Sequence, residues 1–296
     1  MTRKIIFLIV AGFIMGCVSH VKHPESIKKS FVKIHKTVDI NICGENEISK
    51  TNECKKLMSM ASTGSGGVVW NEYKIGGIPR TLVLTAEHLC SEKEYSLKDF
   101  NAGAHLHIKE KMGFKGEVKV VTDSRMVVVD SRGNSFVVKK EPWIMNVAAD
   151  TCIIETSMNV PYLKIGTKPE FGDDAINIAA PKGIYHPSES GGGVYYTQGS
   201  YNGQFLMDRK LNRVFSMYSI SAAPGSSGSP IVNRNGEIIG MIHSIDSSYC
   251  NLITGQCNSP ISYSATLSQI EETLTAAFAA IKRGEGAVFD YKEINQ

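Results

Sequence analysis

The chain is short of several features that mark common classes of protein. Its formal net charge is only +3, and this falls to +1 without residues 1–16, which contain Arg3 and Lys4. A nearly neutral chain gives no case for nucleic-acid binding. No Cys-x2-Cys pair or paired histidine spacing is present, so a zinc site is not expected. Internal repeats and low-complexity segments are absent too, and the length favours one bilobal domain.

The sequence also lacks a long hydrophobic run. A helix needs roughly 20 apolar residues to cross a membrane. The N-terminal apolar run, Ile5–Ile14, follows Arg3 and Lys4 and precedes Gly16-Cys17. This is the layout of a secretory signal, and its end resembles the lipobox of bacterial lipoproteins. The resemblance implies export and lipidation of Cys17. We therefore expect a cell-envelope lipoprotein that faces the periplasm or is attached to the outer membrane, with an uncleaved anchor as the alternative.

Cysteine is present in numbers that suit an exported chain. Six of the seven cysteines remain once Cys17 is set aside. An even number indicates disulfides, although six cysteines allow 15 pairings. Proximity in the sequence favours two pairs and leaves a third. The predicted bridges are Cys43–Cys54, Cys250–Cys257 and Cys90–Cys152.

Helical patterns are scarce and short strands are frequent. Segments rich in Val, Ile and Tyr alternate with Gly, Asn, Asp and Pro, which predicts an all-β sandwich or a pair of barrels. One amphipathic helix is expected, because apolar residues recur at helical spacing from Leu267 to Ile281. Thr266 and Gln269 can form a capping box, and Gly284 is a stop signal. We expect this helix to cover a barrel.

Three short blocks of sequence carry the chemistry. Thr85–Cys90 reads TAEHLC and follows an apolar strand, whereas Gly225–Pro230 reads GSSGSP and precedes one. Asp150 lies between them, directly before the apolar stretch TCIIET. Together with Gly64–Trp70, GSGGVVW, these blocks resemble the histidine, aspartate and serine motifs of chymotrypsin/trypsin-like serine proteases of bacteria and phages. The resemblance covers roughly residues 60–283.

The resemblance implies a catalytic triad whose roles follow from its chemistry. A serine hydroxyl is a weak nucleophile at neutral pH, so Ser227 needs His88 to take its proton. Asp150 would fix the tautomer of His88 and stabilise its charge. The N–H groups of Gly225 and Ser227 would form the oxyanion hole, and a glycine lets its peptide turn toward the substrate. The implied function is an exported serine endopeptidase that forms an acyl-enzyme and needs no metal or organic cofactor.

Other interpretations of these residues are weaker. An α/β-hydrolase elbow, G-x-S-x-G, would need glycine where Ser229 stands, and a helix should follow it. Asp123 and Asp130 lie in strand and turn contexts that predict exposure, and Asp173-Asp174 precedes a strand of the second barrel. For function, the alternatives are a catalytically inactive binding module on the same fold and a structural envelope lipoprotein.

The resemblance also implies where the substrate pocket lies. Ser221 stands at its floor and carries no charge, so a preference for Lys or Arg is not supported. His243, Ser244 and Ile245 stand on its wall. A shift of one residue on a strand reverses the face that a side chain occupies, so His243 either binds substrate or approaches Asp150.

These patterns predict an all-β fold of two six-stranded antiparallel barrels with a C-terminal helix and the site in the cleft between the barrels. A protein or peptide substrate is the expected partner, and the lipid anchor is the expected contact with the membrane. The predicted divisions are 1–16, signal peptide; 17–60, N-terminal lead-in segment and first strand; 61–158, first barrel; 159–262, second barrel; 263–284, helix; and 285–296, tail.

Overall fold

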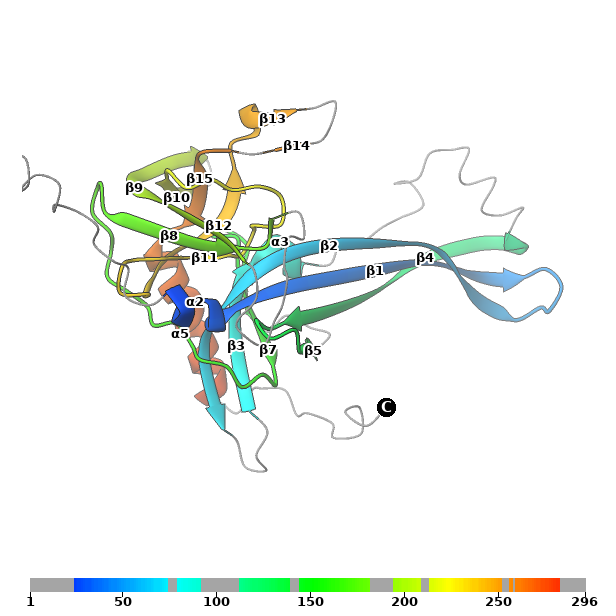
Figure 1. Cartoon of the computed structure of the whole chain (residues 1–296). Coiled ribbons are helices and arrows are strands. Elements are labelled where there is room, and N and C mark those ends of the chain that lie inside the picture. Colours follow the sequence, from blue (N-terminus) through cyan, green and yellow to red (C-terminus); the bar gives the residue numbers. More distant parts are fainter. Residues whose placement is uncertain are drawn as a thin grey trace, which may run out of the picture.

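A computed structural model gives the fold of the chain as two β-sheets and a C-terminal helix (Figure 1). It describes residues 24–73, 79–91, 112–138, 144–181, 194–208, 213–251, 256–257 and 259–282. The predicted signal peptide, Cys17, Gly284 and the predicted tail lie outside these ranges. Within them, no helix combines the length and the apolar character that crossing a membrane requires.

The first sheet is antiparallel and has seven strands. They are β1 (Phe31–Asn46), β2 (Asn52–Tyr73), β3 (Pro79–Ala86), β4 (Phe114–Val129), β5 (Ser135–Val137), β6 (Ile144–Asn146) and β7 (Thr151–Thr156). Their order is β5-β4-β1-β2-β3-β7-β6. In the described residues this half therefore has seven strands where six were predicted, while the arrangement of two antiparallel β-units and a C-terminal helix is as predicted. The short strands β5 and β6, of three residues each, are the two edges and do not pair with each other.

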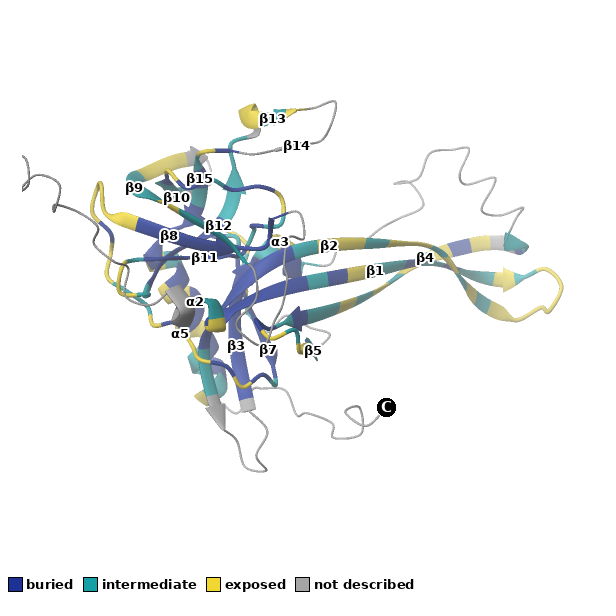
Figure 2. Ribbon diagram, in the orientation of Figure 1, coloured by how far each residue is buried: buried dark blue, intermediate teal, exposed yellow. Residues whose placement is uncertain are grey.

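Part of the first sheet projects from the molecule as an arm. β1 pairs with both β2 and β4 along most of its length, and these three strands extend well beyond the core (Figures 1 and 2). Near its end, Cys43 and Cys54 face each other across the strands and form a disulfide. Ile42, Phe114 and Val118 make a small apolar cluster of their own. The sheet thus begins at Phe31, inside the range expected to hold a lead-in segment and first strand.

The second sheet closes into a six-stranded antiparallel barrel, as predicted. Its order is β10-β15-β12-β11-β8-β9. The strands are β8 (Asp174–Ala179), β9 (Tyr195–Asp208), β10 (Arg213–Tyr218), β11 (Pro230–Val232), β12 (Ile238–Ile245) and β15 (Ser262–Ala265). The remaining elements are α2 (Pro24–Ser30), α3 (Glu87–Cys90), the 3-10 helix η3 (Ser247–Tyr249), β13 (Cys250–Asn251), β14 (Gln256–Cys257) and α5 (Leu267–Lys282).

The C-terminal helix α5 helps to hold the two halves together. It contacts β6 and β7 of the first sheet and β12 of the barrel. One apolar cluster contains Leu82 of β3, Ile176 of β8 and Ile270 of α5. Figure 2 shows β3 and β8 as mostly buried. The predicted capping box is present, because Thr266 N donates to Gln269 Oε1 (2.8 Å) and Gln269 N donates to Thr266 Oγ1 (3.3 Å).

Candidate active site

His88 and Asp150 are brought together by the pairing of two neighbouring strands. β3 runs antiparallel to β7, and Ala86 pairs with Thr151. The residues just beyond this pair therefore meet at one end of the sheet. There α3 begins, and Glu87 N donates to Asp150 O (3.1 Å). The predicted histidine and aspartate thus lie side by side, although they are far apart in the sequence.

The carboxylate of Asp150 holds His88 through both its backbone and its side chain. His88 Nδ1 lies 2.8 Å from Asp150 Oδ2 and 3.1 Å from Oδ1, and His88 N donates to Oδ1 (2.9 Å). Asp150 has a φ of 50°, which a residue other than glycine adopts rarely and at a cost in free energy. Such a backbone strain at a side chain with these contacts is typical of a functional site.

A disulfide and a hydrogen bond stabilise the turn that carries His88. Cys90 and Cys152 form a disulfide, each two residues beyond His88 or Asp150. The ammonium of Lys36, on β1, donates to Ser91 O (2.6 Å) at the end of α3. A cation is favourable at the C-terminal end of a helix. β1, a strand of the arm, thus helps to stabilise the turn that carries His88.

Asp150 also accepts a hydrogen bond from the second barrel. His243 Nδ1, on β12, lies 3.0 Å from Asp150 Oδ2. Burial of Asp150 opposes ionisation, but hydrogen bonds from His243 and His88 outweigh it and hold the pKa of this carboxyl well below its ordinary value. The residue is therefore an anion at neutral pH and suited to stabilise a protonated imidazole.

Ser227 lies in a tight loop that packs against the end of β3. Gly228 has a φ of 83°, and a Cβ there would come within 2.2 Å of both Ser65 O and Thr85 Oγ1. Ser65 N donates to Ser227 O (2.8 Å), and Gly228 N donates to Ile242 O (2.7 Å). The loop therefore sits between the first sheet and β12, next to the turn that carries His88.

The side chains of Ser227 and His88 are not hydrogen-bonded to each other in this structure. No hydrogen bond links Ser227 Oγ to His88 among the residues that it describes. His88 is exposed and Ser227 is half-buried, so a ligand can reach both. In proteins without substrate, catalytic hydrogen bonds are often long and shorten when substrate binds.

The same loop presents two backbone donors. Gly225 has a φ of 96°, a conformation that favours glycine. Within the described parts of the chain, the N–H groups of Gly225 and Ser227 donate to no acceptor, whereas Ser226 N donates to Ala223 O and Gly228 N to Ile242 O. A developing oxyanion at Ser227 would need two such donors, and here one is the N–H of Ser227 itself and the other that of Gly225, two residues earlier.

Ser65 is a residue of this site that the sequence motifs did not single out. It is fully buried, and its hydroxyl donates to Gly225 O (2.8 Å) and accepts from Ala180 N (3.0 Å). Thr85 Oγ1 in turn donates to Ser65 O (2.8 Å). Ser65 lies inside GSGGVVW and Thr85 inside TAEHLC. The motifs therefore contained both residues but did not identify them as part of the site.

The predicted pocket residues are divided between two environments. His243 and Ser244 bond to each other, since Ser244 Oγ lies 3.0 Å from His243 Nε2. Ile245 packs partly against the apolar cluster of the second barrel. Ser221 precedes Ala222, which forms a two-way backbone bridge with Ser259. Contact of Ser221, Ser244 and Ile245 with a substrate stays a prediction.

The competing acids are not part of the site. The prediction that Asp130 is exposed is wrong, because only 2% of it is accessible. Its carboxylate accepts from the backbone N–H groups of Arg132 and Asn134, both at 2.9 Å, and so stabilises its own turn. Asp174 instead forms an ion pair with Arg234 at the surface.

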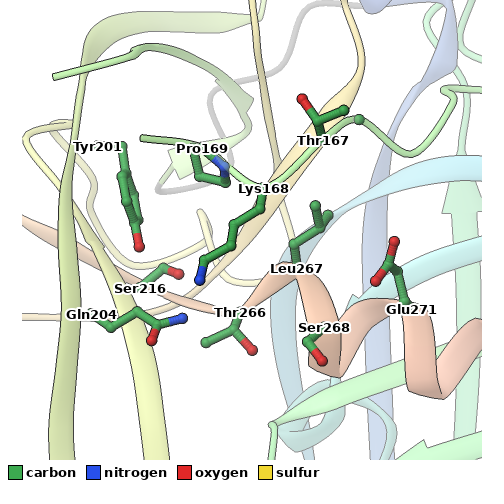
Figure 3. Close-up of a pocket in the computed structure, with 11 residues that line it drawn as sticks. Thr167, Lys168, Pro169, Tyr201, Gln204, Ser216, Thr266, Leu267, Ser268 and Glu271 are labelled. Carbon is green, nitrogen blue, oxygen red and sulfur yellow. The ribbon is translucent and has the colours of Figure 1, made fainter. Parts of the chain in front are cut away.

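A cavity elsewhere in the barrel is separate from these residues. It lies between the loop after Ile165, strands β9 and β10, and the start of α5 (Figure 3). None of the residues predicted for the triad, the oxyanion hole or the substrate pocket lines it. Its polar lining includes Lys168, Gln204 and Glu271.

Comparisons with known proteins agree with this fold. Residues 64–241 match the model of a family described as "Trypsin-like peptidase domain". No curated protein sequence matches the chain. The chain is similar in fold to the HtrA-type protease AlgW with a decapeptide (15% identity, TM-score 0.55, covering 88% of this chain and 66% of that one).

Two further solved structures are similar to the chain. A variant of AlgW with a decapeptide gives 14% identity and a TM-score of 0.54, covering 88% of this chain and 65% of that one. The serine endoprotease from Yersinia pestis gives 14% and 0.49, with coverage of 85% and 63%. At such identities the AlgW structures support the fold alone. The chain spans less than two thirds of the length of these solved chains.

Proposed function

Since the chain belongs to the trypsin-like peptidase domain family, we propose that it is a serine endopeptidase that uses Ser227, His88 and Asp150. The observation that carries the proposal is the Asp150–His88 pair, with the side chains 2.8 Å apart, beside a serine loop with two unpaired N–H groups. We further propose that the protein is exported and anchored by a lipid on Cys17, which the N-terminal signal supports.

The proposed reaction uses each group in turn. Ser227 Oγ attacks the carbonyl carbon of the substrate while His88 Nε2 takes its proton. Asp150 keeps the proton of His88 on Nδ1 and stabilises the imidazolium. The N–H groups of Gly225 and Ser227 receive the oxyanion. His88 then protonates the leaving amine, and water hydrolyses the acyl-enzyme by the reverse sequence.

A hydrolysis assay tests this proposal. The chain from residue 17 onward, with Cys17→Ser to remove the lipid site, is produced in an oxidising compartment and incubated with fluorescently labelled casein. We expect release of small fluorescent peptides, and none from Ser227→Ala or His88→Ala. Folded, disulfide-intact protein that cleaves neither casein nor a mixed peptide library would contradict the proposal.

A further inference from the structure

The acid of the proposed triad is shared by two histidines from different halves of the molecule. Asp150 Oδ2 lies 2.8 Å from His88 Nδ1 and 3.0 Å from His243 Nδ1. His88 comes from the first sheet, whereas His243 comes from β12 of the barrel. We propose that His243 is a positioning residue that fixes the Asp150 carboxylate in the orientation that His88 requires. This inference rests on the proposed function.

A break in strand register aims His243 at Asp150. In the pairing of β12 with β15, Ile242 pairs with Ser264 and Ser244 with Tyr263, so His243 is an extra residue between them. A β-bulge of this kind re-aims a side chain, and bulges are common next to active sites. The bulge places His243 between two paired positions, and from there its side chain reaches Asp150.

The ring of His243 is held by contacts with Asp150, Ser244 and Phe215. Its second nitrogen, Nε2, lies 3.0 Å from Ser244 Oγ, and the centroid of its ring lies 4.2 Å from that of the Phe215 ring, with the two planes tilted by 32°. Only 14% of the side chain is exposed. The network assigns the tautomer: Nδ1 donates to Asp150, and Nε2 accepts from the Ser244 hydroxyl. With both nitrogens engaged, His243 is not free to bind substrate.

β12 therefore sets the position of the nucleophile relative to the acid. Ile242 O accepts from Gly228 N (2.7 Å), next to Ser227, and the adjacent residue His243 contacts Asp150. Two consecutive residues thus connect the serine loop and the aspartate turn. Asp150 needs such a tether because its φ of 50° is strained. Without the barrel's donor, its carboxylate would be held by His88 alone.

Two substitutions separate positioning from packing. His243→Leu keeps an apolar side chain against Phe215 but removes the donor, whereas His243→Asn places an amide N–H close to the position of the imidazole Nδ1–H. Each variant of the Cys17→Ser chain is inactivated with a fluorophosphonate, and the rate of bond formation is separated from the binding constant. A hydrogen bond to a charged group is worth roughly 1.5–3 kcal/mol, or about 10- to 100-fold in rate.

We expect His243→Leu to slow bond formation by about 10- to 100-fold with little change in binding, and His243→Asn to recover most of the rate. Equal rates for wild type and His243→Leu, or equal losses in both variants, would overturn the inference. Wild-type protein that does not react at all would instead overturn the proposed function.

A second measurement does not depend on activity. In Ser227→Ala protein, the low-field proton NMR spectrum should contain signals from both Nδ1–H groups that face Asp150. We expect His243→Leu to remove one signal and shift the other, which belongs to His88. If the His88 signal is unchanged by His243→Leu, the two histidines do not act on a common carboxylate, and the inference is overturned.

Discussion

Gly228 shows at a single residue how closely the serine loop fits its surroundings. Its φ is 83°, and a Cβ would meet Ser65 O and Thr85 Oγ1 at 2.2 Å. Gly172 has a similar φ of 89° but nothing within 4 Å of such a Cβ. A comparison of substitutions at Gly172 and Gly228 therefore separates the cost of backbone strain from the cost of a steric clash.

We expect Gly172→Ala to lower the free energy of unfolding by about 1–3 kcal/mol, from strain alone, and Gly228→Ala to lower it further and to abolish hydrolysis. Urea denaturation and the casein assay measure the two effects. Equal stability losses in the two variants would show that the loop is not packed as the structure has it.

The ionised form of Asp150 also affects stability. Burial opposes ionisation of Asp150, but hydrogen bonds from His243 and His88 lower its pKa below the ordinary value of 3.8. A carboxyl whose pKa is lower in the folded state adds stability above its unfolded pKa, and this is lost as the pH falls through the folded pKa. Asparagine, which tolerates a positive φ, is the matched substitution.

We expect Asp150→Asn to be less stable than wild type near neutral pH, with a difference that shrinks as the pH falls below 3.8. Urea denaturation at a series of pH values measures it. A stability difference that stays constant from neutral pH to about pH 2.5 would mean that the carboxylate is not stabilised in the folded state.

The same substitution should reduce catalysis. Asp150→Asn cannot fix the tautomer of His88 as an anion does, so we expect casein hydrolysis to fall by about 10³- to 10⁴-fold, the scale of tautomer losses in Ser-His-Asp sites. Circular dichroism verifies that the variant is folded. Activity within about tenfold of wild type would exclude Asp150 from the role that we assign to it.

At the scale of elements, the Cys90–Cys152 bridge connects α3 to β7 beside the site. It closes 62 residues, whereas Cys43–Cys54 closes 11 on the arm. Longer loops give larger entropic stabilisation. The two bridges thus form a matched pair, one beside the site and one distant from it.

We expect Cys90→Ala/Cys152→Ala to lower the free energy of unfolding by about 2–4 kcal/mol and to reduce casein hydrolysis, because His88 and Asp150 lose their link. Cys43→Ala/Cys54→Ala should cost less and leave hydrolysis unchanged. If both double variants hydrolyse casein at the wild-type rate, the bridge does not support the catalytic geometry.

Local patterns predict elements well where the interactions are local. The Thr266–Gln269 capping box needs residues three apart, and its prediction was confirmed. The arm was not predicted, because β2 contains Asn, Lys and Gly, which have low strand propensity. Its 22 residues are held extended by pairing with β1 and β3. That pairing is long-range and leaves little trace in the sequence of β2.

The same difference between local and long-range interactions decides which site residues the sequence predicts. The motifs predict that His88, Asp150 and Ser227 belong to one site through their resemblance to serine-protease motifs. They do not show the bulge at His243, which depends on how β12 pairs with β15. They also do not resolve Ser65, whose contacts with Gly225 and Ala180 join segments more than 100 residues apart.

At the scale of the whole molecule, the proposed site exists only where the two halves meet. The first sheet supplies His88 and Asp150, and the barrel supplies Ser227 and His243. The shared apolar cluster and α5 hold these halves in contact. The central claim is therefore that this contact activates one serine.

Covalent labelling tests that claim most directly. The Cys17→Ser chain, produced in an oxidising compartment, is treated with a fluorophosphonate probe, and the modified residue is located by mass spectrometry. We predict one modified residue, Ser227, and no labelling in Ser227→Ala or in urea-unfolded protein. Labelling at a different serine, or none in the folded protein with intact disulfides, would contradict the account.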